Sequence, residues 1–518
     1  MAIYLKNLYL GSADGDTESN KKEFLELFYT GNNKYAEITN EPLKYIIYGR
    51  KGTGKTILGR YIEKKYNAKG VVSKIINKDD ITLAKMIEKN NEILSIKEAG
   101  LFFKWIVYYQ IFKIIEDINL NYPFKLNKQF LIEYKKIKAY KKAIKDLKSI
   151  FNDRYKKENF EFHEFVAEEE LQRGAEITAE KKGILGSKIS EQTKRGRKAT
   201  YIKSEFFNLL DEVEKNILIC LKAVSVVLIF DDLDELDIDL ADETGAMTAI
   251  NKLIEALKNI NMIFANNELT PTKCILLIRS DIIEELNKRS TNLNKIIQDN
   301  AVELYWIDKE NKKPESHPLM EMILTKVKTS CSEYKDLSNK QIYDKLFPEL
   351  IGGVNAVSFL INQGFGRPRD IINYLEIIRR KYPNEICFRA TMFKECKQAY
   401  SQAFLNELYN EMVIHIENDK IDGYIQLLRD YGQNSFYPNQ IKAYYKRHRK
   451  NYKISININE FIETLYKFGA VGNMWSVKKG GKDKKAYSWA YRKNGNQNVN
   501  LEQRCSVHYG LRKILNLQ

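Results

Sequence analysis

One eight-residue segment constrains the fold of this 518-residue chain more than any other feature. Residues 49–56 are Gly-Arg-Lys-Gly-Thr-Gly-Lys-Thr and fit the pattern G-x-x-x-x-G-K-[ST] without deviation. An apolar run at 44–48 precedes the segment, and apolar residues at helical spacing follow it from Thr56 to Tyr66. A strand, a glycine-rich loop and a helix in direct succession predict a phosphate-binding loop inside an α/β domain. Residues 49–56 are called the phosphate loop below.

Each fixed position of the phosphate loop has a chemical reason. Its glycines let backbone N–H groups wrap phosphate oxygens at a helix N-terminus, where the helix dipole favours anions. Lys55 would neutralise charge on the β- and γ-phosphates, and the Thr56 hydroxyl would ligate Mg²⁺. We therefore expect ATP and Mg²⁺ as cofactors. The expected nucleotide contacts are all eight loop residues: Gly49, Arg50, Lys51, Gly52, Thr53, Gly54, Lys55 and Thr56.

A second motif, Asp-Asp-Leu-Asp-Glu, follows the apolar run 225–230. Its first residue, Asp231, lies 176 positions after Lys55. A phosphate loop needs a carboxylate at the end of a neighbouring strand to hold the metal, and Asp231 is the expected ligand. Asp232 is the first candidate for activating the attacking water, and Glu235 is the second. The alternative is a solvated acidic turn, which explains the charge but not its match to the phosphate loop.

The spacing of the two motifs also predicts how the chain is divided. Strand patterns at 71–76, 225–230, 274–278 and 302–306 alternate with helical patterns, which predicts a parallel sheet with helices on both faces. A separation of 176 residues requires a helical insertion between the motifs. The expected domains are a core at 1–80 and 218–312, a helical insertion at 81–217, a helical lid at 313–405 and a basic winged-helix-like domain at 406–518.

The positive charge of the chain is concentrated at its C-terminal end. From Lys442 onward there are 17 Lys and Arg against four acids, which accounts for +13 of the net charge of +16. Three helical patterns there combine with short aromatic strands, expected at Asn473–Lys478 and Tyr487–Arg492, and this mixture is typical of a winged helix. Such a footprint favours contact with double-stranded DNA, and the alternative is a solvated basic surface.

These motifs resemble a known group of proteins. Asp-Asp-Leu-Asp-Glu after a hydrophobic strand is similar to the Walker B motif of KAP and NACHT-type P-loop ATPases, and of bacterial ATPases related to them and to origin-recognition initiators. The resemblance implies an α/β P-loop NTPase core of the AAA+ and STAND (signal-transducing switch ATPase) group, followed by a helical lid and a winged helix. The chain departs from sensor proteins of this group in lacking a C-terminal repeat array, and from origin-recognition proteins in its early insertion.

The resemblance also assigns roles to residues outside the two motifs. Arg279, in Ile278-Arg-Ser-Asp281, resembles the sensor-1 position that reads the γ-phosphate. Within Gly366–Asp370 the resemblance assigns two residues to the nucleotide. Pro368 corresponds to a Gly-x-Pro motif against the adenine, and Arg369 corresponds to a sensor-2 arginine. Taken alone, an arginine after a strand is more often a surface residue, and glycine and proline punctuate a helix start.

The segment Phe461–Gly472, with Trp475 and Trp489 downstream, resembles the last helix and wing of the winged-helix domain in these families. In the STAND class this domain often packs on the nucleotide to lock an inactive state, so DNA contact and such a lock both stay open. The lysines that would contact DNA phosphates are Lys478, Lys479, Lys482, Lys484 and Lys485.

The leading hypothesis is a Mg²⁺-dependent ATPase that acts as a switch or motor on or near DNA. From the resemblance alone we add a role in bacterial antiviral defence with a separately encoded effector. A homo-oligomer is expected because an arginine finger normally comes from a neighbouring subunit. The alternative is a non-catalytic scaffold that holds ATP or ADP and regulates a partner protein. A nucleotide kinase is less favoured, because no substrate-lid signature is visible.

Other features of the sequence bear on metal binding, on localisation and on contact with nucleic acid. The six cysteines lie far apart without a Cys-x-x-Cys pair, and the five histidines do not join them at metal-ligand spacing, which predicts reduced thiols and no structural zinc. No run of 18 apolar residues and no secretory signal pattern occurs, which predicts a cytoplasmic protein without a membrane partner. The lysine-rich helical stretch 135–157 would line a nucleic-acid channel or, more often for such patterns, form a solvated face.

Overall fold

The computed structural model describes residues 3–77, 96–121, 134–154, 209–231, 243–289, 292–308, 311, 313–479, 481–493, 495–496 and 498–518. The chain divides into two compact units. Unit 1 comprises Met1–Asn33, Gly49–Ile57 and Leu304–Gln518, and unit 2 comprises Lys34–Tyr48 and Leu58–Glu303. Each unit has a hydrophobic core of its own.

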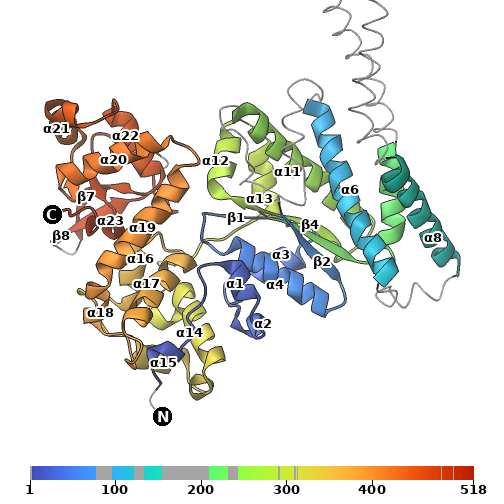
Figure 1. Ribbon diagram of the computed structural model, residues 1–518, viewed down its shortest axis with the longest axis horizontal. Coiled ribbons are helices and arrows are strands. Elements are labelled where there is room, and N and C mark those ends of the chain that lie inside the picture. Colours follow the sequence, from blue (N-terminus) through green and yellow to red (C-terminus); the bar gives the residue numbers. More distant parts are fainter. Residues whose placement is uncertain are drawn as a thin grey trace, which may run out of the picture. The chain divides into compact units, whose positions relative to one another are not determined.

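Unit 2 is built on a parallel five-stranded sheet of order β2-β3-β4-β1-β5 (Figure 1). The central strands β3 and β4 are buried along their whole length, as expected for apolar runs in a parallel sheet covered by helices. The predicted sheet is thereby confirmed, although its last strand is shorter than the expected 302–306. The strands are β1 (Ile46–Gly49), β2 (Val72–Ile76), β3 (Val226–Phe230), β4 (Lys273–Arg279) and β5 (Ala301–Glu303).

Helices cover both faces of this sheet (Figure 1). Alternate strand residues such as Leu228 and Leu276 share a core with α6 and α11. On the other face lies Gly59 of α4, where an added Cβ would stand only 2.9 Å from Leu277 and 3.5 Å from Ile229. The glycine therefore lets α4 approach the sheet closely. The helices that include residues of unit 2 are α3 (Lys34–Asn40), α4 (Lys55–Ala68), α6 (Ile96–Asn121), α8 (Tyr134–Lys148), α11 (Glu243–Asn266), α12 (Ser280–Arg289) and α13 (Leu293–Asn300).

Several aromatic residues of the predicted insertion, among them Trp105, Phe112 and Phe151, are buried in the core of unit 2. Trp105 and Phe112 of α6 pack on Phe151, with ring centroids 4.9 and 5.0 Å apart. Phe151 lies in a π-helical turn, Ser149–Arg154, that continues α8. The helices expected near 102–118 and 134–151 are therefore present, whereas the polar stretch 174–198 lies outside the described residues.

The helical part of unit 1 follows sequence signals for helix starts. Proline occupies the first turn of α14 and α17, and Ser338 with Gln341 forms a capping box at α15. The N-terminal segment joins the same core through Leu5, Leu8 and Leu10. The helices here are α1 (Gly15–Ser19), α2 (Phe24–Leu27), α14 (Pro318–Ser330), α15 (Asn339–Leu346), α16 (Ala356–Gln363), α17 (Pro368–Lys381), α18 (Ala390–Glu395) and α19 (Lys397–Met412).

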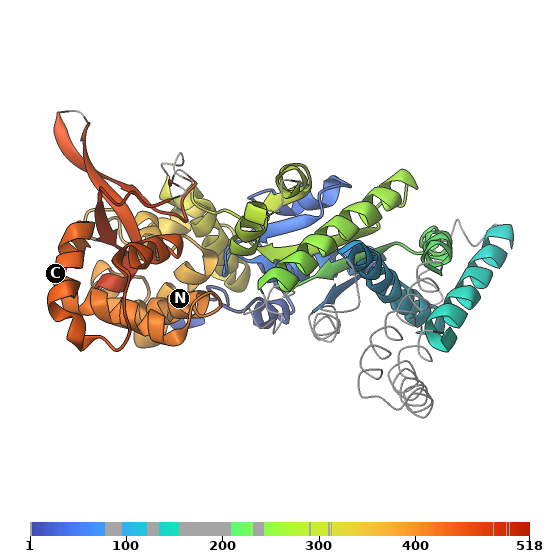
Figure 2. The ribbon, with the colours of Figure 1, turned by 90° about the horizontal axis from the view of Figure 1, so that it is seen from above.

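Unit 1 ends in a module of helices and a small antiparallel sheet, residues 413–518, called the C-terminal module below. Its sheet has the order β6-β9-β7-β8, and Figure 2 shows the β7–β8 hairpin extending away from the helices of this unit. Its elements in chain order are α20 (Asn418–Tyr431), β6 (Ser435–Phe436), α21 (Pro438–His448), α22 (Ile458–Lys467), β7 (Val471–Lys479), β8 (Lys482–Ser488), β9 (Arg504–Val507) and α23 (Tyr509–Arg512).

The strand expected at Tyr487–Arg492 is wrong in its position. The chain turns at Gly481, which has φ +73°, and Lys479 pairs with Lys482, so that the second strand begins at Lys482 and ends at Ser488. A two-residue connection between paired strands requires this early start. Trp489, placed inside the predicted strand, instead lies buried beyond its end.

None of the helices that the structure describes has the length and apolar character needed to cross a membrane. The six cysteines are free thiols, and five of them are buried.

Candidate nucleotide-binding site

The phosphate loop connects the end of β1 to the start of α4, as its sequence predicts. Gly52 and Gly54 have φ values of +82° and +95°, which favour glycine, and a Cβ on Gly49 would lie 2.6 Å from Thr53 Oγ1. The Thr53 hydroxyl donates to the Arg50 carbonyl at 2.8 Å and closes the loop. Lys55 Nζ donates to the carbonyls of Gly49 and Arg50 at 3.2 and 3.4 Å, so its ammonium group lies at the mouth of this turn.

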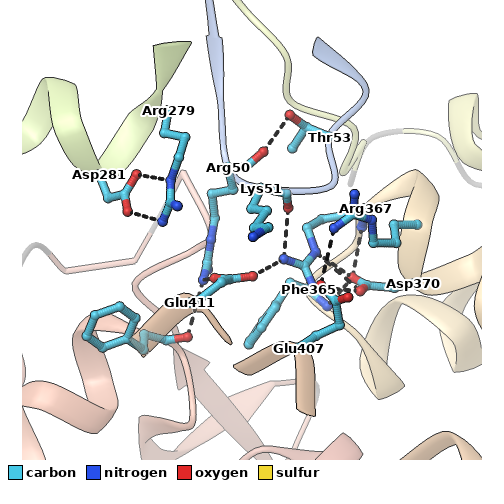
Figure 3. A network of polar contacts seen from close by, with 12 residues as sticks. Arg50, Lys51, Thr53, Arg279, Asp281, Phe365, Arg367, Asp370, Glu407 and Glu411 are labelled. Atoms are coloured by element: carbon cyan, nitrogen blue, oxygen red, sulfur yellow. Dashed lines mark hydrogen bonds and ion pairs between the residues drawn. The ribbon is translucent and has the colours of Figure 1, made fainter. Parts of the chain in front are cut away.

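Donors from the C-terminal part of unit 1 hold the carbonyl side of the loop. Arg367 Nη1 donates to the Lys51 carbonyl at 2.9 Å, as Figure 3 shows, and Trp306 Nε1 donates to the Thr53 carbonyl at 2.9 Å. In a trans peptide the N–H of the next residue points opposite to the carbonyl. The N–H groups of Gly52 and Gly54 therefore point away from Arg367 and Trp306, an orientation that leaves them available to an anion on the other side.

A glycine-rich turn before α17 presents Arg367 to the loop. Gly366 has φ +69°, and a Cβ there would lie 2.5 Å from Ile307 Cγ1. Asp370 accepts the Phe365 N–H at 2.8 Å and also pairs with the Arg367 guanidinium, with Nη2 to Oδ1 at 2.8 Å and Nε to Oδ2 at 3.1 Å. The carboxylate thereby fixes both the turn and the direction of the arginine.

A second carboxylate, Glu411 of α19, joins Arg367 to Arg50 of the phosphate loop (Figure 3). Glu411 accepts from Arg367 Nη1 at one oxygen and from Arg50 Nη2, at 2.9 Å, at the other. Both guanidinium groups lie against the ring of Phe365, at 4.5 Å for Arg50 and 4.8 Å for Arg367. Arg50, Arg367, Asp370 and Glu411 are called the arginine network below.

The arginine network is ionised and balanced in charge. Burial alone would raise the pKa of Glu411, but Arg367 and Arg50 bring it below its ordinary value. Burial alone would lower the pKa of Arg367, yet Asp370 and Glu411 raise it. Two arginines thus face two carboxylates, the arrangement that makes buried charge tolerable.

Pro368 and Arg369, which the resemblance assigned to the nucleotide, lie beside the loop. Pro368 is the buried first residue of α17. The Arg369 backbone N–H donates to the Gly52 carbonyl at 3.5 Å, and a Cβ on Gly52 would lie 3.2 Å from Arg369 Cβ. The Arg369 guanidinium donates to the Ala13 carbonyl at 3.2 Å and to Glu407 at 3.3 Å. Both residues are thus neighbours of the phosphate loop, and their contact with a nucleotide stays a prediction.

The remaining predicted residues belong to unit 2, except Thr56, which lies in the first turn of α4. Asp231 follows β3 directly, is buried, and donates its backbone N–H to the Ile76 carbonyl at 3.1 Å. Arg279 ends β4, is buried, and forms a two-point pair with Asp281 at 3.0 and 2.5 Å. Because β3 and β4 are parallel neighbours, both residues lie at the carboxyl edge of the sheet. Asp232 and Glu235 lie outside the described residues.

Three residues that contact the phosphate loop or the side chain of Arg50 were not predicted from the sequence. Arg367 stood inside the motif Gly366–Asp370, whose proline and second arginine received the assigned roles. Trp306 was placed in a strand. Glu411 occupies a helix that carries no local signal, and its partner Arg50 is 361 positions away in the sequence.

The helical region that supplies Arg367 matches a known family model. Residues 317–409 are similar to the FunZ-associated C-terminal helical domain. The match extends from the start of α14 into α19 and includes Arg367 and Asp370, whereas the phosphate loop lies outside it. The chain thus combines a parallel five-stranded α/β core with a FunZ-associated helical domain. A search of curated proteins found no match.

Proposed function

We propose that this protein binds ATP with Mg²⁺ and hydrolyses it, and that it acts as a switch or motor on or near DNA. The observation that carries the proposal is the geometry of the phosphate loop. Its carbonyls at Lys51 and Thr53 are taken by side-chain donors, so the N–H groups of Gly52 and Gly54 turn the other way. Lys55 adds a positive charge at the same turn. These are the features that a polyphosphate needs from a protein.

The proposed roles follow the chemistry of each side chain. Lys55 would neutralise the β- and γ-phosphates, and Arg279 would respond to the γ-phosphate. The Thr56 hydroxyl and the Asp231 carboxylate offer the hard oxygen ligands that Mg²⁺ prefers. Bound magnesium would offset charge on the transferred phosphoryl group. Asp232, or in second place Glu235, would orient the attacking water, and Pro368 and Arg369 would contact the nucleotide from α17.

The C-terminal module supports a contact with double-stranded DNA. Its order α20-β6-α21-α22-β7-β8 agrees with the order expected of a winged helix, in which the hairpin would be the wing. Lys478, Lys484 and Lys485 are exposed on this hairpin, and Trp475 and Val477 are partly exposed beside them. A basic hairpin of this kind suits the phosphate backbone of DNA.

A non-catalytic scaffold remains the second candidate, because the arginine network would hold the loop in one shape whether or not ATP is cleaved. A role in antiviral defence with a separate effector, and assembly into a homo-oligomer, are proposals from the resemblance alone.

Steady-state ATP hydrolysis by the wild type, Lys55→Ala and Asp232→Ala, each with and without duplex DNA, tests the proposal. We expect DNA-stimulated turnover that both variants lose. Turnover retained in Lys55→Ala would refute the assigned site. ATP binding without turnover under every condition would favour the scaffold.

A further inference from the structure

Arg50 occupies a variable position of the phosphate loop, yet its side chain contacts the C-terminal part of unit 1 (Figure 3). Its Nη2 donates to Glu411 at 2.9 Å and to the Phe468 carbonyl at 3.2 Å. Its guanidinium carbon lies 4.5 Å from the ring centre of Phe365 and 5.8 Å from that of Tyr491. Such contacts use the charge, the donors and the flat face of the group together.

We propose that Arg50 is a positioning residue that couples the nucleotide in the phosphate loop to the C-terminal module. The inference rests on the proposed function, since it assigns a regulation to the same nucleotide site. The Arg50 side chain is not a phosphate ligand in this account. Its role is to make the shape of the loop depend on where the C-terminal module sits.

The charge balance of the arginine network explains why Arg50 stays in place. Arg367 has Asp370 as a close partner, so Arg50 is the cation that completes the neutralisation of Glu411. Withdrawing Arg50 toward a phosphate would leave Glu411 and Asp370, both buried, with a single arginine between them. An unbalanced charge in a buried site is strongly unfavourable.

Glu411 ties the loop to α19 at two points. One oxygen accepts from Arg367, which itself holds the Lys51 carbonyl, and the other accepts from the Arg50 side chain. A shift of α19 is therefore transmitted to the loop through a backbone carbonyl and through a side chain at once.

The contacts of Arg50 reach the base of the β7–β8 hairpin. Phe468 is the C-cap residue of α22, and the next residue, Gly469, has φ +80° and would place a Cβ 2.9 Å from both Phe365 and Tyr491. Tyr491 follows β8 in the sequence. A ligand that moves or rigidifies the hairpin base would change the surroundings of Arg50. Where such a ligand changes the affinity for the nucleotide, linkage requires the nucleotide to change the affinity for that ligand by the same factor.

Hydrogen exchange tests this coupling without knowledge of the module's ligand. Full-length wild-type protein, Arg50→Gln and Arg50→Lys are compared with and without Mg-ATP. The wild type should gain protection at 468–474 and 489–492 by about fivefold or more, the lower end of typical coupling. The contact expected between Arg50 and the nucleotide is through the loop backbone, which Arg50→Gln retains, so this variant should bind ATP measurably, even if more weakly, but lose the response. Arg50→Lys should retain part of the response because the charge on Glu411 stays balanced.

Arg379→Gln is the matched control, because Arg379 pairs with Glu376 of the same helix, away from the loop. It should respond to ATP as the wild type does.

Three outcomes would overturn the inference: a wild type that binds ATP without any response at these segments, an Arg50→Gln variant with the full response, or an Arg50→Gln variant that loses ATP binding as completely as Lys55→Ala. Failure of the wild type to bind ATP would instead refute the proposed function, on which the coupling depends. Glu411→Gln, which removes the same ion pair from the other side, should lose the response as Arg50→Gln does. Urea denaturation of each variant shows separately whether it is folded.

Discussion

The contacts that stabilise the sheet of unit 2 differ in kind from those that hold the phosphate loop within unit 1. The sheet buries apolar residues that follow one another in the chain, such as those of β3. The loop is held by hydrogen bonds and ion pairs between residues hundreds of positions apart, such as Arg50 and Glu411. Apolar burial is non-directional and tolerates small shifts, whereas buried ion pairs require specific geometry. The comparison indicates that the sheet provides a framework and that the network sets the shape of the loop.

The largest expected effect comes from removing the shared carboxylate. Glu411→Ala leaves Arg50 and Arg367 facing each other with Asp370 as the one remaining carboxylate of the network. We expect the free energy of unfolding of unit 1 to fall by about 4 kcal/mol, as when one partner of a buried pair is removed. Urea denaturation measures it. Asp344→Ala, which breaks the exposed Lys340–Asp344 pair, is the control and should lower the free energy of unfolding far less, because water screens this pair. Equal losses would show that the network contributes no more than a surface pair.

A core truncation in unit 2 tests whether the sheet also influences the shape of the phosphate loop. Leu228 is fully buried in β3, and Leu228→Ala should lower the free energy of unfolding of unit 2 by about 3 kcal/mol through lost burial and a cavity. The wild-type response of 468–474 to ATP in hydrogen exchange should be kept in this variant. Loss of that response would mean that the sheet, and not the arginine network, determines the shape of the phosphate loop.

A pH dependence should arise in the C-terminal module. Burial, followed by the charges of Arg492, Arg512 and Arg50, holds the pKa of His508 well below its usual value of 6.5. The folded state therefore keeps His508 neutral while the unfolded chain takes up a proton below about pH 6.5. Stability from this group is constant above that pH and falls by up to about 1.4 kcal/mol for each pH unit below it. Urea midpoints at pH 7.0 and 5.5 should differ less in His508→Gln than in the wild type; an unchanged difference would contradict this assignment.

The smallest effect concerns a single hydrogen bond on the loop. Trp306→Phe keeps the ring packing near Tyr29 but removes the donor to the Thr53 carbonyl. We expect ATP to bind less favourably by about 1 kcal/mol, which is roughly a fivefold rise in its Kd. Calorimetry measures this change. Trp475→Phe, a change on the hairpin, should leave that Kd unaltered. An unaltered Kd in Trp306→Phe would show that the loop keeps its shape without this donor.

Sequence reasoning located the sheet because buried parallel strands are continuous apolar runs. The run 225–230 corresponds to β3 within one residue. The run 302–306 was too long, because the chain leaves the sheet after Glu303 and Trp306 instead binds the loop. The spacing of apolar residues does not show whether such a segment continues a strand or leaves the sheet to pack elsewhere.

The candidate site was predictable only where its chemistry is local. Gly52, Gly54 and Lys55 belong to one contiguous pattern, and their positions follow from it. Glu411 could not be found, because its partners lie 44 and 361 positions away and nothing in its own helix marks it. Arg367 could have been suspected from its place between Gly366 and Asp370, since an arginine three residues before an acid at a helix start favours an ion pair.

The most direct test of the account is calorimetric titration of Mg-ATP into the full-length wild type and Lys55→Ala. We expect saturable binding by the wild type and a Kd at least about tenfold higher in Lys55→Ala, which corresponds to about 1.4 kcal/mol. Equal affinity in the two proteins, or no binding by the wild type, would contradict the assignment of residues 49–56 as the nucleotide site.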